Sequence, residues 1–261
     1  MIVSIHAEEM LGALFVLAFA GVLFAYGIRT RLVGRAIDAR VAREPGTILL
    51  GRFPIEAMHW AARAAGLFFV RCKVSPDVLT MTSLLITMGS LPLSATGHHL
   101  FAGCVFVFGA AFDALDGIVA RARGMACQAG EVLDAVVDRY ADAAPLIGLA
   151  IYFRGDIWSL LIVVLALFGS MMVSYVRAKH EAIGVRLPGW VMRRAERIAY
   201  IAAGLILGPL VERFGIRGLT SDRVILGFVG LVAIVSQLAA ARLMLQGRSM
   251  LLGVLHTDKR S

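Results

Sequence analysis

DALDGIVARARGMACQAGEVLDAVVD, residues 113–138, places four aspartates and a glutamate in a chain that is otherwise strongly apolar. The 261 residues are 59% hydrophobic, with a mean hydropathy of +0.80, whereas soluble domains contain about 45–50% apolar residues. A charge at bilayer depth costs about 2.5–3.5 kcal/mol, so carboxylates there need partners, water or metal ions. The stretch therefore predicts a membrane protein with a functional site among its helices.

Windows of about 20 apolar residues, long enough to cross a ~30 Å hydrocarbon core as helices, recur along the chain. Because these windows are continuous and do not alternate, they predict an all-α integral membrane bundle and exclude a barrel of strands. The predicted spans are 10–28, 78–96, 100–120, 132–153, 157–175, 198–210 and 224–245. The first span follows acidic residues, unlike a cleaved signal peptide, so we expect it to be retained.

Basic residues set the expected orientation. Residues 29–52 hold six arginines against two acidic residues, which predicts a cytoplasmic position. Residues 54–70 are too short and too polar to span, and they predict an amphipathic helix in the cytoplasmic interface. When successive spans cross the membrane in alternating directions, most other basic residues lie on the same side. The net charge of +8 is therefore explained by membrane topology rather than by nucleic-acid binding. We expect a multi-pass protein of the inner cell membrane with its site on the cytoplasmic side.

The aspartates form two pairs at neighbouring helix ends. Asp113 and Asp116 are three residues apart at the end of one predicted helix, and Asp134 and Asp138 are four apart at the start of the next. Such spacings share one helix face, and a short connection makes the helices antiparallel neighbours whose pairs can converge. Mg²⁺ combines few carboxylates with substrate phosphates, and two such ions can clamp a phosphoryl displacement. The spacing thus favours a divalent-cation site.

Two glycines and an arginine accompany the carboxylates. Gly117 and Gly130 remove side chains where a ligand can approach the backbone, and Arg121, one turn after Gly117, can bind a phosphate through two hydrogen bonds. Glycines in membrane helices also serve packing, and intramembrane aspartates also form the proton relays of transporters. A non-enzymatic ion or proton transport protein therefore stays an alternative.

The pattern D-x2-D-G-x2-A-R-x8-G-x3-D-x3-D, which begins at Asp113 and ends at Asp138, resembles that of the CDP-alcohol phosphotransferase family at all eight fixed positions. These proteins are also called CDP-alcohol phosphatidyltransferases. The resemblance implies a six-helix membrane enzyme, usually a homodimer, that transfers a phosphate-bearing group from a CDP-linked donor to an alcohol and releases CMP. In lipid-making members the donor is CDP-diacylglycerol.

The resemblance also implies roles for individual residues. Asp113, Asp116 and Asp134 would be ligands of two Mg²⁺ or Mn²⁺ ions, and Asp138 would contact the second ion and act as general base on the acceptor hydroxyl. The residues that would hold the CDP donor are Asp77, Thr80, Gly117 and Arg121. Members often carry a small hydroxyl residue where this chain has Cys127, which implies the loss of one hydrogen bond to the donor phosphate.

The acceptor has to be inferred from basic residues outside this stretch. Five of them at predicted cytoplasmic helix ends are Arg177, Lys179, Arg194, Arg197 and Arg242. Such residues also anchor helices at the membrane surface, but their placement resembles that of the residues with which phosphatidylinositol-phosphate synthases of the family hold inositol phosphate. We expect a phosphorylated acceptor. Glycerol 3-phosphate, as used by phosphatidylglycerophosphate synthase, and unphosphorylated alcohols such as serine or inositol stay open.

The resemblance covers residues 75 to 248 and divides the chain. We expect an additional N-terminal transmembrane helix with its basic linker at 1–50, the interfacial helix at 51–74, the catalytic domain at 75–250 and a cytoplasmic tail at 251–261. The expected partners are CDP-diacylglycerol, a small polar alcohol, membrane lipids and a second copy of the chain, with no nucleic acid.

Overall fold

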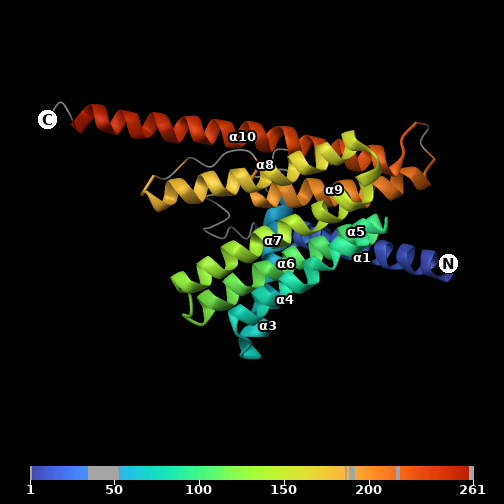
Figure 1. Ribbon diagram of the computed structural model, residues 1–261. Coiled ribbons are helices and arrows are strands. Elements are labelled where there is room, and N and C mark those ends of the chain that lie inside the picture. Colours follow the sequence, from blue (N-terminus) through green and yellow to red (C-terminus); the bar gives the residue numbers. More distant parts are fainter. Residues whose placement is uncertain (1, 35–52, 186, 188–191, 216–217, 259–261) are drawn as a thin grey trace.

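The computed structural model describes residues 2–34, 53–185, 187, 192–215 and 218–258, and within these ranges it contains helices and no strand (Figure 1). The helices are α1 (Ile2–Val33), α3 (Phe53–Arg71), α4 (Pro76–Met88), α5 (Ser90–Ala95), α6 (His99–Ala122), α7 (Gln128–Tyr152), the 3-10 turn η1 (Phe153–Gly155), α8 (Ile157–Ala182), α9 (Arg194–Arg213) and α10 (Ser221–Asp258). The all-α prediction is confirmed for these residues.

Four described segments are long and apolar enough to cross a membrane. They are Pro76–Ala95, His99–Ala122, Ile157–Ala182 and Ser221–Leu252. Each corresponds to a predicted span, and together they confirm the prediction of a membrane protein. The total of seven spans and the interfacial position of α3 stay predictions, and most of the predicted basic linker lies outside the described residues.

The helices form two groups that meet along α6 (Figure 1). In one group α10 lies along α8 and α9, and in the other α6 packs against α3 and α4. Because α6 also contacts α9, it joins the two groups. The C-terminal half of α6 carries the first two aspartates of the predicted site.

The main hydrophobic core lies between the two groups. Phe106 from α6, Leu146 from α7, Leu205 from α9 and Val229 from α10 are almost completely buried in it. A smaller cluster around Leu79, Leu115 and Val119 packs α4 against α6 beside the predicted site. These two clusters fix α6 from both sides.

Local contacts determine where the helices around the site begin and end. The side chain of Ser75 caps α4 by accepting a hydrogen bond from Val78 N at 3.4 Å, and Pro76 occupies the first turn, where its missing N–H costs nothing. Arg123, directly after α6, donates to the backbone oxygens of Lys73 and Val74 at 3.2 and 2.9 Å. This contact ties the end of α6 to the turn before α4.

The N-terminal helix is attached through a buried polar contact. Tyr26 is completely buried, and its hydroxyl donates to Oε2 of Glu56 in α3 at 3.1 Å. Its ring lies 5.4 Å from that of Phe53 and 5.9 Å from that of Trp60, both on α3. The helix that the sequence predicts as an addition is therefore joined to the bundle through α3.

Candidate active site

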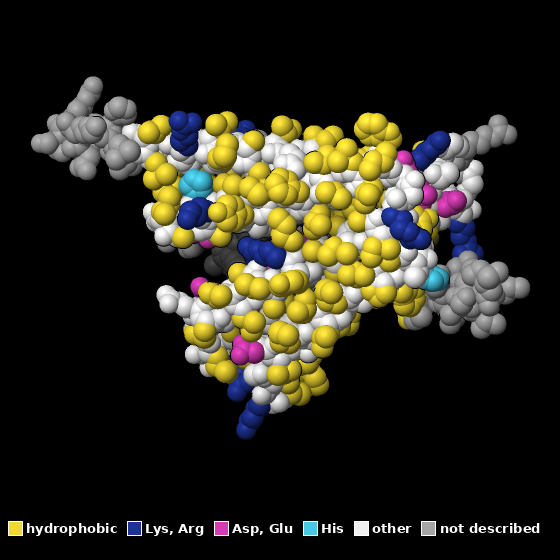
Figure 2. Space-filling view, in the orientation of Figure 1, with side chains coloured by type: hydrophobic (Ala, Val, Ile, Leu, Met, Phe, Trp, Pro, Cys, Tyr) yellow, Lys and Arg dark blue, Asp and Glu magenta, His cyan; other side chains and the backbone are white. Residues whose placement is uncertain are grey.

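A cavity of about 1260 Å³ lies between α4, α6, α7, α8 and α9, and we call it the central cavity. All four aspartates of the 113–138 stretch line it from α6 and α7, and four arginines line it from α8 and α9. Figure 2 shows the apolar surface of the molecule hollowed between the α8–α10 group and the group that contains α6 and α7, with charged side chains near the opening. We call the side with the four aspartates the acidic wall and the side with the four arginines the basic wall.

Three carboxylates of the acidic wall lie close together. Asp113, Asp116 and Asp134 each offer an oxygen, and these oxygens lie within 4.8 Å of one another. Both pairs therefore converge on one cavity, as predicted, and three of the four aspartates form a tighter group. Carboxylates at this separation repel unless a cation lies among them, and a set of oxygen ligands suits Mg²⁺ or Mn²⁺. The donor set fits the predicted divalent ions.

Hydroxyl groups from α4 orient these carboxylates. Thr80 Oγ1 donates to Asp116 Oδ2 at 2.5 Å, and Ser83 Oγ, which donates to the backbone oxygen of Thr80 at 2.7 Å, lies 3.5 Å from Asp113 Oδ1. The backbone N–H of Gly117 donates to the other oxygen of Asp116. Thr80 was predicted to hold the donor, and here it contacts a carboxylate of the cluster. Ser83 was missed, although its position three residues after Thr80 gives it the same helix face.

Asp138 lies outside the three-carboxylate group and shares Arg194 with Asp113. Nη1 of Arg194 is 2.8 Å from Asp138 Oδ1 and 2.6 Å from Asp113 Oδ2, and Nε of the same side chain is 3.2 Å from Asp142 Oδ1. Arg194 was predicted to hold the acceptor, yet it contacts the acidic wall directly. The guanidinium separates Asp138 from Asp142 and offsets part of the charge of this wall.

Arg177 carries unpaired donors in the central cavity. Its Nε and Nη2 are buried and have no hydrogen-bond partner among the described residues. Arg193 and Arg197, which line the same cavity, repel it electrostatically, and Glu181 and Glu196 attract it. Since buried polar groups are normally hydrogen-bonded, these donors suit an anionic ligand.

Two of the five predicted acceptor residues do not line the central cavity. Lys179, in the last turn of α8, and Arg242, in α10, are both exposed and are absent from the cavity lining. Arg177, Arg194 and Arg197 do line it. The structure therefore brings three of the five basic residues together.

The four residues predicted to hold CDP all line the same cavity. Asp77 and Thr80 come from α4, and Gly117 and Arg121 come from α6. A Cβ atom at Gly117 would lie 3.0 Å from Nη1 of Arg121, so the arginine folds back over the glycine. The absence of a side chain at Gly117 leaves room for the guanidinium at the cavity wall.

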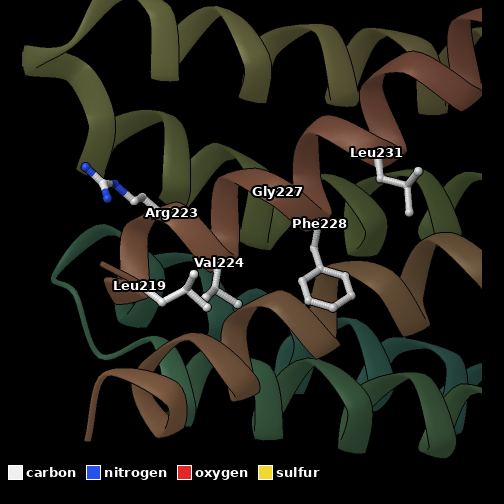
Figure 3. Close-up of a pocket in the computed structure, with 6 residues that line it drawn as sticks. All are labelled: Leu219, Arg223, Val224, Gly227, Phe228 and Leu231. Atoms are coloured by element: carbon white, nitrogen blue, oxygen red, sulfur yellow. The ribbon is translucent and has the colours of Figure 1, made fainter. Parts of the chain in front are cut away.

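A second hollow lies on α10 and the loop before it, away from these charges (Figure 3). Its lining residues are Leu219, Arg223, Val224, Gly227, Phe228 and Leu231, around about 340 Å³. Arg223 is the single charged residue of this lining, and the lining holds no carboxylate, histidine or cysteine. Without a nucleophile or a base it is not a candidate active site.

Sequence reasoning missed Asp142, which is buried and contacts two arginines of the basic wall. Its position four residues after Asp138 places it on the same face of α7. The eight-position pattern ends at Asp138, so Asp142 was not considered with it. Arg193 was likewise not assigned a role, although it directly precedes Arg194.

The sequence model described as CDP-alcohol phosphatidyltransferase matches residues 73–247. The chain is 33% identical over 178 residues to the phosphatidylinositol phosphate synthase of Mycobacteroides abscessus, a match that covers 66% of this chain and 80% of the relative. It is 34% identical over 142 residues to the archaetidylinositol phosphate synthase of Methanothermobacter thermautotrophicus, covering 54% of this chain and 71% of the relative.

Solved structures of a similar enzyme share the fold. The phosphatidylinositol phosphate synthase of Mycobacterium tuberculosis with CDP-DAG bound superimposes with a TM-score of 0.63 at 26% sequence identity, over 71% of this chain and 92% of that chain. The same enzyme in complex with manganese and citrate gives a TM-score of 0.63 at 26% identity, over 71% and 88%.

Proposed function

The chain belongs to the CDP-alcohol phosphatidyltransferase family, and we propose that it transfers the phosphatidyl group of CDP-diacylglycerol to inositol phosphate and releases CMP. It is a membrane enzyme of phospholipid biosynthesis. The similar enzymes named above are phosphatidylinositol phosphate and archaetidylinositol phosphate synthases, which supports a phosphorylated inositol as acceptor.

One observation carries the proposal: a single cavity joins a cluster of three carboxylates to a wall of arginines. The carboxylates suit cations that would hold the donor diphosphate, and the arginines suit the phosphate of the acceptor. A transferase that joins a CDP-linked donor to a phosphorylated alcohol needs both at once. A proton relay, the alternative for a transport protein, needs no such wall of arginines.

We assign Asp113, Asp116 and Asp134 as the ligands of the divalent ions, with Asp138 contributing to the second ion. When bound, two such ions would offset charge on the diphosphate and stabilise the phosphoryl displacement. The oxygen-only donor set and the manganese complex of the similar enzyme support Mg²⁺ or Mn²⁺. The hydroxyl of Thr80 and the backbone N–H of Gly117 hold Asp116 in place.

Asp138 is assigned as the general base. The acceptor hydroxyl attacks the phosphorus that bears diacylglycerol, the bond from that phosphorus to the phosphate oxygen of CMP breaks, and the hydroxyl proton passes to Asp138. Arg194, at 2.8 Å, fixes the orientation of this carboxylate. Asp77, Thr80, Gly117 and Arg121 are assigned to the CDP part of the donor, since all four line the cavity.

The acceptor phosphate is assigned to the basic wall. Two buried donors of Arg177 that have no partner in the described ranges support this, and Arg194 and Arg197 line the cavity beside it. A role for Lys179 and Arg242 stays a prediction, since neither lines the cavity. The arginines would hold the acceptor so that its hydroxyl faces Asp138.

The remaining expectations concern the whole chain. We propose a protein of the inner cell membrane with the central cavity on the cytoplasmic side, because most basic residues collect there when the spans are threaded alternately. We further propose a homodimer, as implied by the family, and a catalytic domain at 75–250 preceded by the transmembrane helix of 1–50 and the interfacial helix of 51–74.

The reaction is tested with purified protein in detergent or in vesicles, with CDP-diacylglycerol and Mg²⁺ or Mn²⁺. The acceptors to compare are inositol phosphate, glycerol 3-phosphate, inositol, glycerol and serine. We expect metal-dependent release of CMP that is fastest with inositol phosphate. Faster release with glycerol 3-phosphate would replace the acceptor but keep the reaction, and the absence of CMP with every acceptor would remove the proposed function.

A further inference from the structure

We propose that Asp142 is a positioning residue that holds Arg194 and Arg197 in the orientations that the transfer reaction needs. This inference rests on the proposed function of the central cavity. Asp142 lies outside the eight-position pattern and has been given no role above. It is 7% exposed and follows Asp138 by one helical turn on the same face of α7.

The carboxylate of Asp142 is shared between two arginines, one through each oxygen. Oδ1 accepts from Nε of Arg194 at 3.2 Å, and Oδ2 accepts from Nη2 of Arg197 at 3.0 Å. The two arginines lie on the first turn of α9, so this single side chain joins α7 to the start of α9. Rotation of either guanidinium would break one of these hydrogen bonds.

The orientation of the Arg194 guanidinium decides whether it contacts the acidic wall. Its Nε is engaged by Asp142, which leaves Nη1 to contact Asp113 at 2.6 Å and Asp138 at 2.8 Å. A planar guanidinium has its five donors in a fixed arrangement, so fixing Nε fixes the direction of Nη1. Through Arg194, Asp142 therefore sets the orientation of the carboxylate assigned as base.

Arg197 depends on Asp142 more strongly, because it is 4% exposed. Its remaining contacts are to neutral acceptors: Nη1 donates to the backbone oxygen of Met192 at 2.9 Å, and Nη2 also approaches Ser174 Oγ at 3.3 Å. A buried cation without a carboxylate is strongly unfavourable. The charge of Asp142 therefore keeps Arg197 at the basic wall, next to Arg177.

Asp142→Asn tests the inference, because the amide keeps the size of the side chain but presents an N–H₂ group to one of the two arginines. The loss of a charge-assisted hydrogen bond is expected to raise the KM for inositol phosphate at least about tenfold and to lower kcat. The KM for CDP-diacylglycerol is expected to change less than about twofold, since Asp142 contacts none of the four residues assigned to CDP. An unchanged or lower KM for inositol phosphate would overturn the inference.

The matched control is Asp222→Asn, an equivalent change in α10 whose carboxylate accepts from Tyr152 at 3.3 Å and lies outside the central cavity. It is expected to leave all three kinetic constants at their wild-type values. Asp142→Glu, which keeps the charge, is expected to restore part of the affinity for inositol phosphate. A merely structural role would shift thermal stability without this rescue of KM.

A double-mutant cycle separates positioning from general destabilisation. Arg197→Gln and Asp142→Asn are expected to be strongly non-additive in KM for inositol phosphate, because each disrupts the same contact. Additive effects would contradict the inference. If Asp142→Asn does not accumulate in membranes, Asp142→Ser, which also removes the carboxylate, takes its place in the cycle. Failure of the wild-type enzyme to release CMP would instead refute the proposed function, so the two failures are distinguishable.

Discussion

Asp138 contacts Arg194 at 2.8 Å and lies 3.9 Å from Arg139, and it stands outside the group of Asp113, Asp116 and Asp134, whose oxygens gather within 4.8 Å of one another. This difference separates their expected functions. Asp138→Asn is expected to lower kcat by about 10²–10⁴-fold, the usual contribution of a general base. Binding of CDP-diacylglycerol, measured by equilibrium titration, is expected to persist. Near-full activity of this variant would refute the assignment of Asp138 as base.

Asp113 belongs to the three-carboxylate cluster, and its loss should change the metal dependence itself. Asp113→Asn is expected to raise the Mn²⁺ concentration required for half-maximal activity, and to weaken Mn²⁺ binding measured directly by calorimetry, because one anionic ligand is removed. Glu131→Gln is the matched control, since Glu131 is an exposed carboxylate in the lining of the same cavity but outside the cluster. Equal Mn²⁺ affinities for both variants would contradict the assignment.

Two buried donors of Arg177 have no hydrogen-bond partner within the part of the chain that the structure describes, so its removal should leave the protein folded and affect ligand binding. Arg177→Ala is expected to raise the KM for inositol phosphate by about tenfold or more, the effect of losing a charge-assisted contact. The KM for unphosphorylated inositol, if it is used at all, should not change. Arg223→Ala, on the distant face of α10, serves as control. An unchanged KM for every phosphorylated acceptor would refute the anion site.

The residues of the acidic wall could be predicted from the sequence better than those of the basic wall. The spacing of Asp113, Asp116 and Asp134 determines a shared face within two adjacent helices, and such local geometry follows from helical periodicity. The arginines lie on α8, α9 and α10, and which of them meet depends on how distant helices pack. Lys179 and Arg242 could therefore not be separated from Arg177, Arg194 and Arg197 by their positions in the chain.

The sequence predicts that these segments are helices, but it does not predict where each helix ends. The predicted span 157–175 stops where charged residues begin, yet α8 continues to Ala182 and is followed by Gly184 at a φ of +77°. A hydropathy window marks the apolar segment, whereas a helix continues into the interface until a residue ends it. Gly184 was the local signal for this end, since glycine adopts such a conformation at little cost.

The close packing of α7 against α5 can be tested at one glycine. A Cβ atom at Gly148 in α7 would collide with the backbone oxygen of Leu91 in α5, which has no side-chain freedom to move away. Gly148→Ala is expected to destabilise the protein by about 1–3 kcal/mol through overpacking. A lower midpoint of thermal unfolding in detergent would show this.

Gly227→Ala is the control for this substitution, because a Cβ atom there meets nothing within 4 Å. Alanine is favoured over glycine inside a helix by about 1 kcal/mol, so the midpoint should stay or rise. Equal destabilisation by both variants would show that the contact between α5 and α7 is not as described.

The proposed orientation of the molecule in the membrane can be tested by chemical labelling of its cysteines. Cys127, between α6 and α7, is exposed, whereas Cys104 in the interior of α6 is buried. A membrane-impermeant maleimide is expected to label Cys127 in inside-out vesicles of a Cys72→Ser variant and not in intact cells. Cys104 should stay unlabelled in both until the protein is denatured. Labelling of Cys127 from the outer side would reverse the topology.

The charges of α7 also bear on how the chain enters the membrane during synthesis. α7 is 25 residues long, but it is not among the four segments apolar enough to cross a bilayer by composition, because Asp134, Asp138 and Asp142 occupy one face. The cation that contacts the last two is Arg194, which is translated 52 residues after Asp142. Within α7 itself Arg139 lies 3.9 Å from Asp138, whereas the two cations on Asp142 both lie on α9. We therefore expect α7 to become fully stable in the membrane only after α9 has been translated.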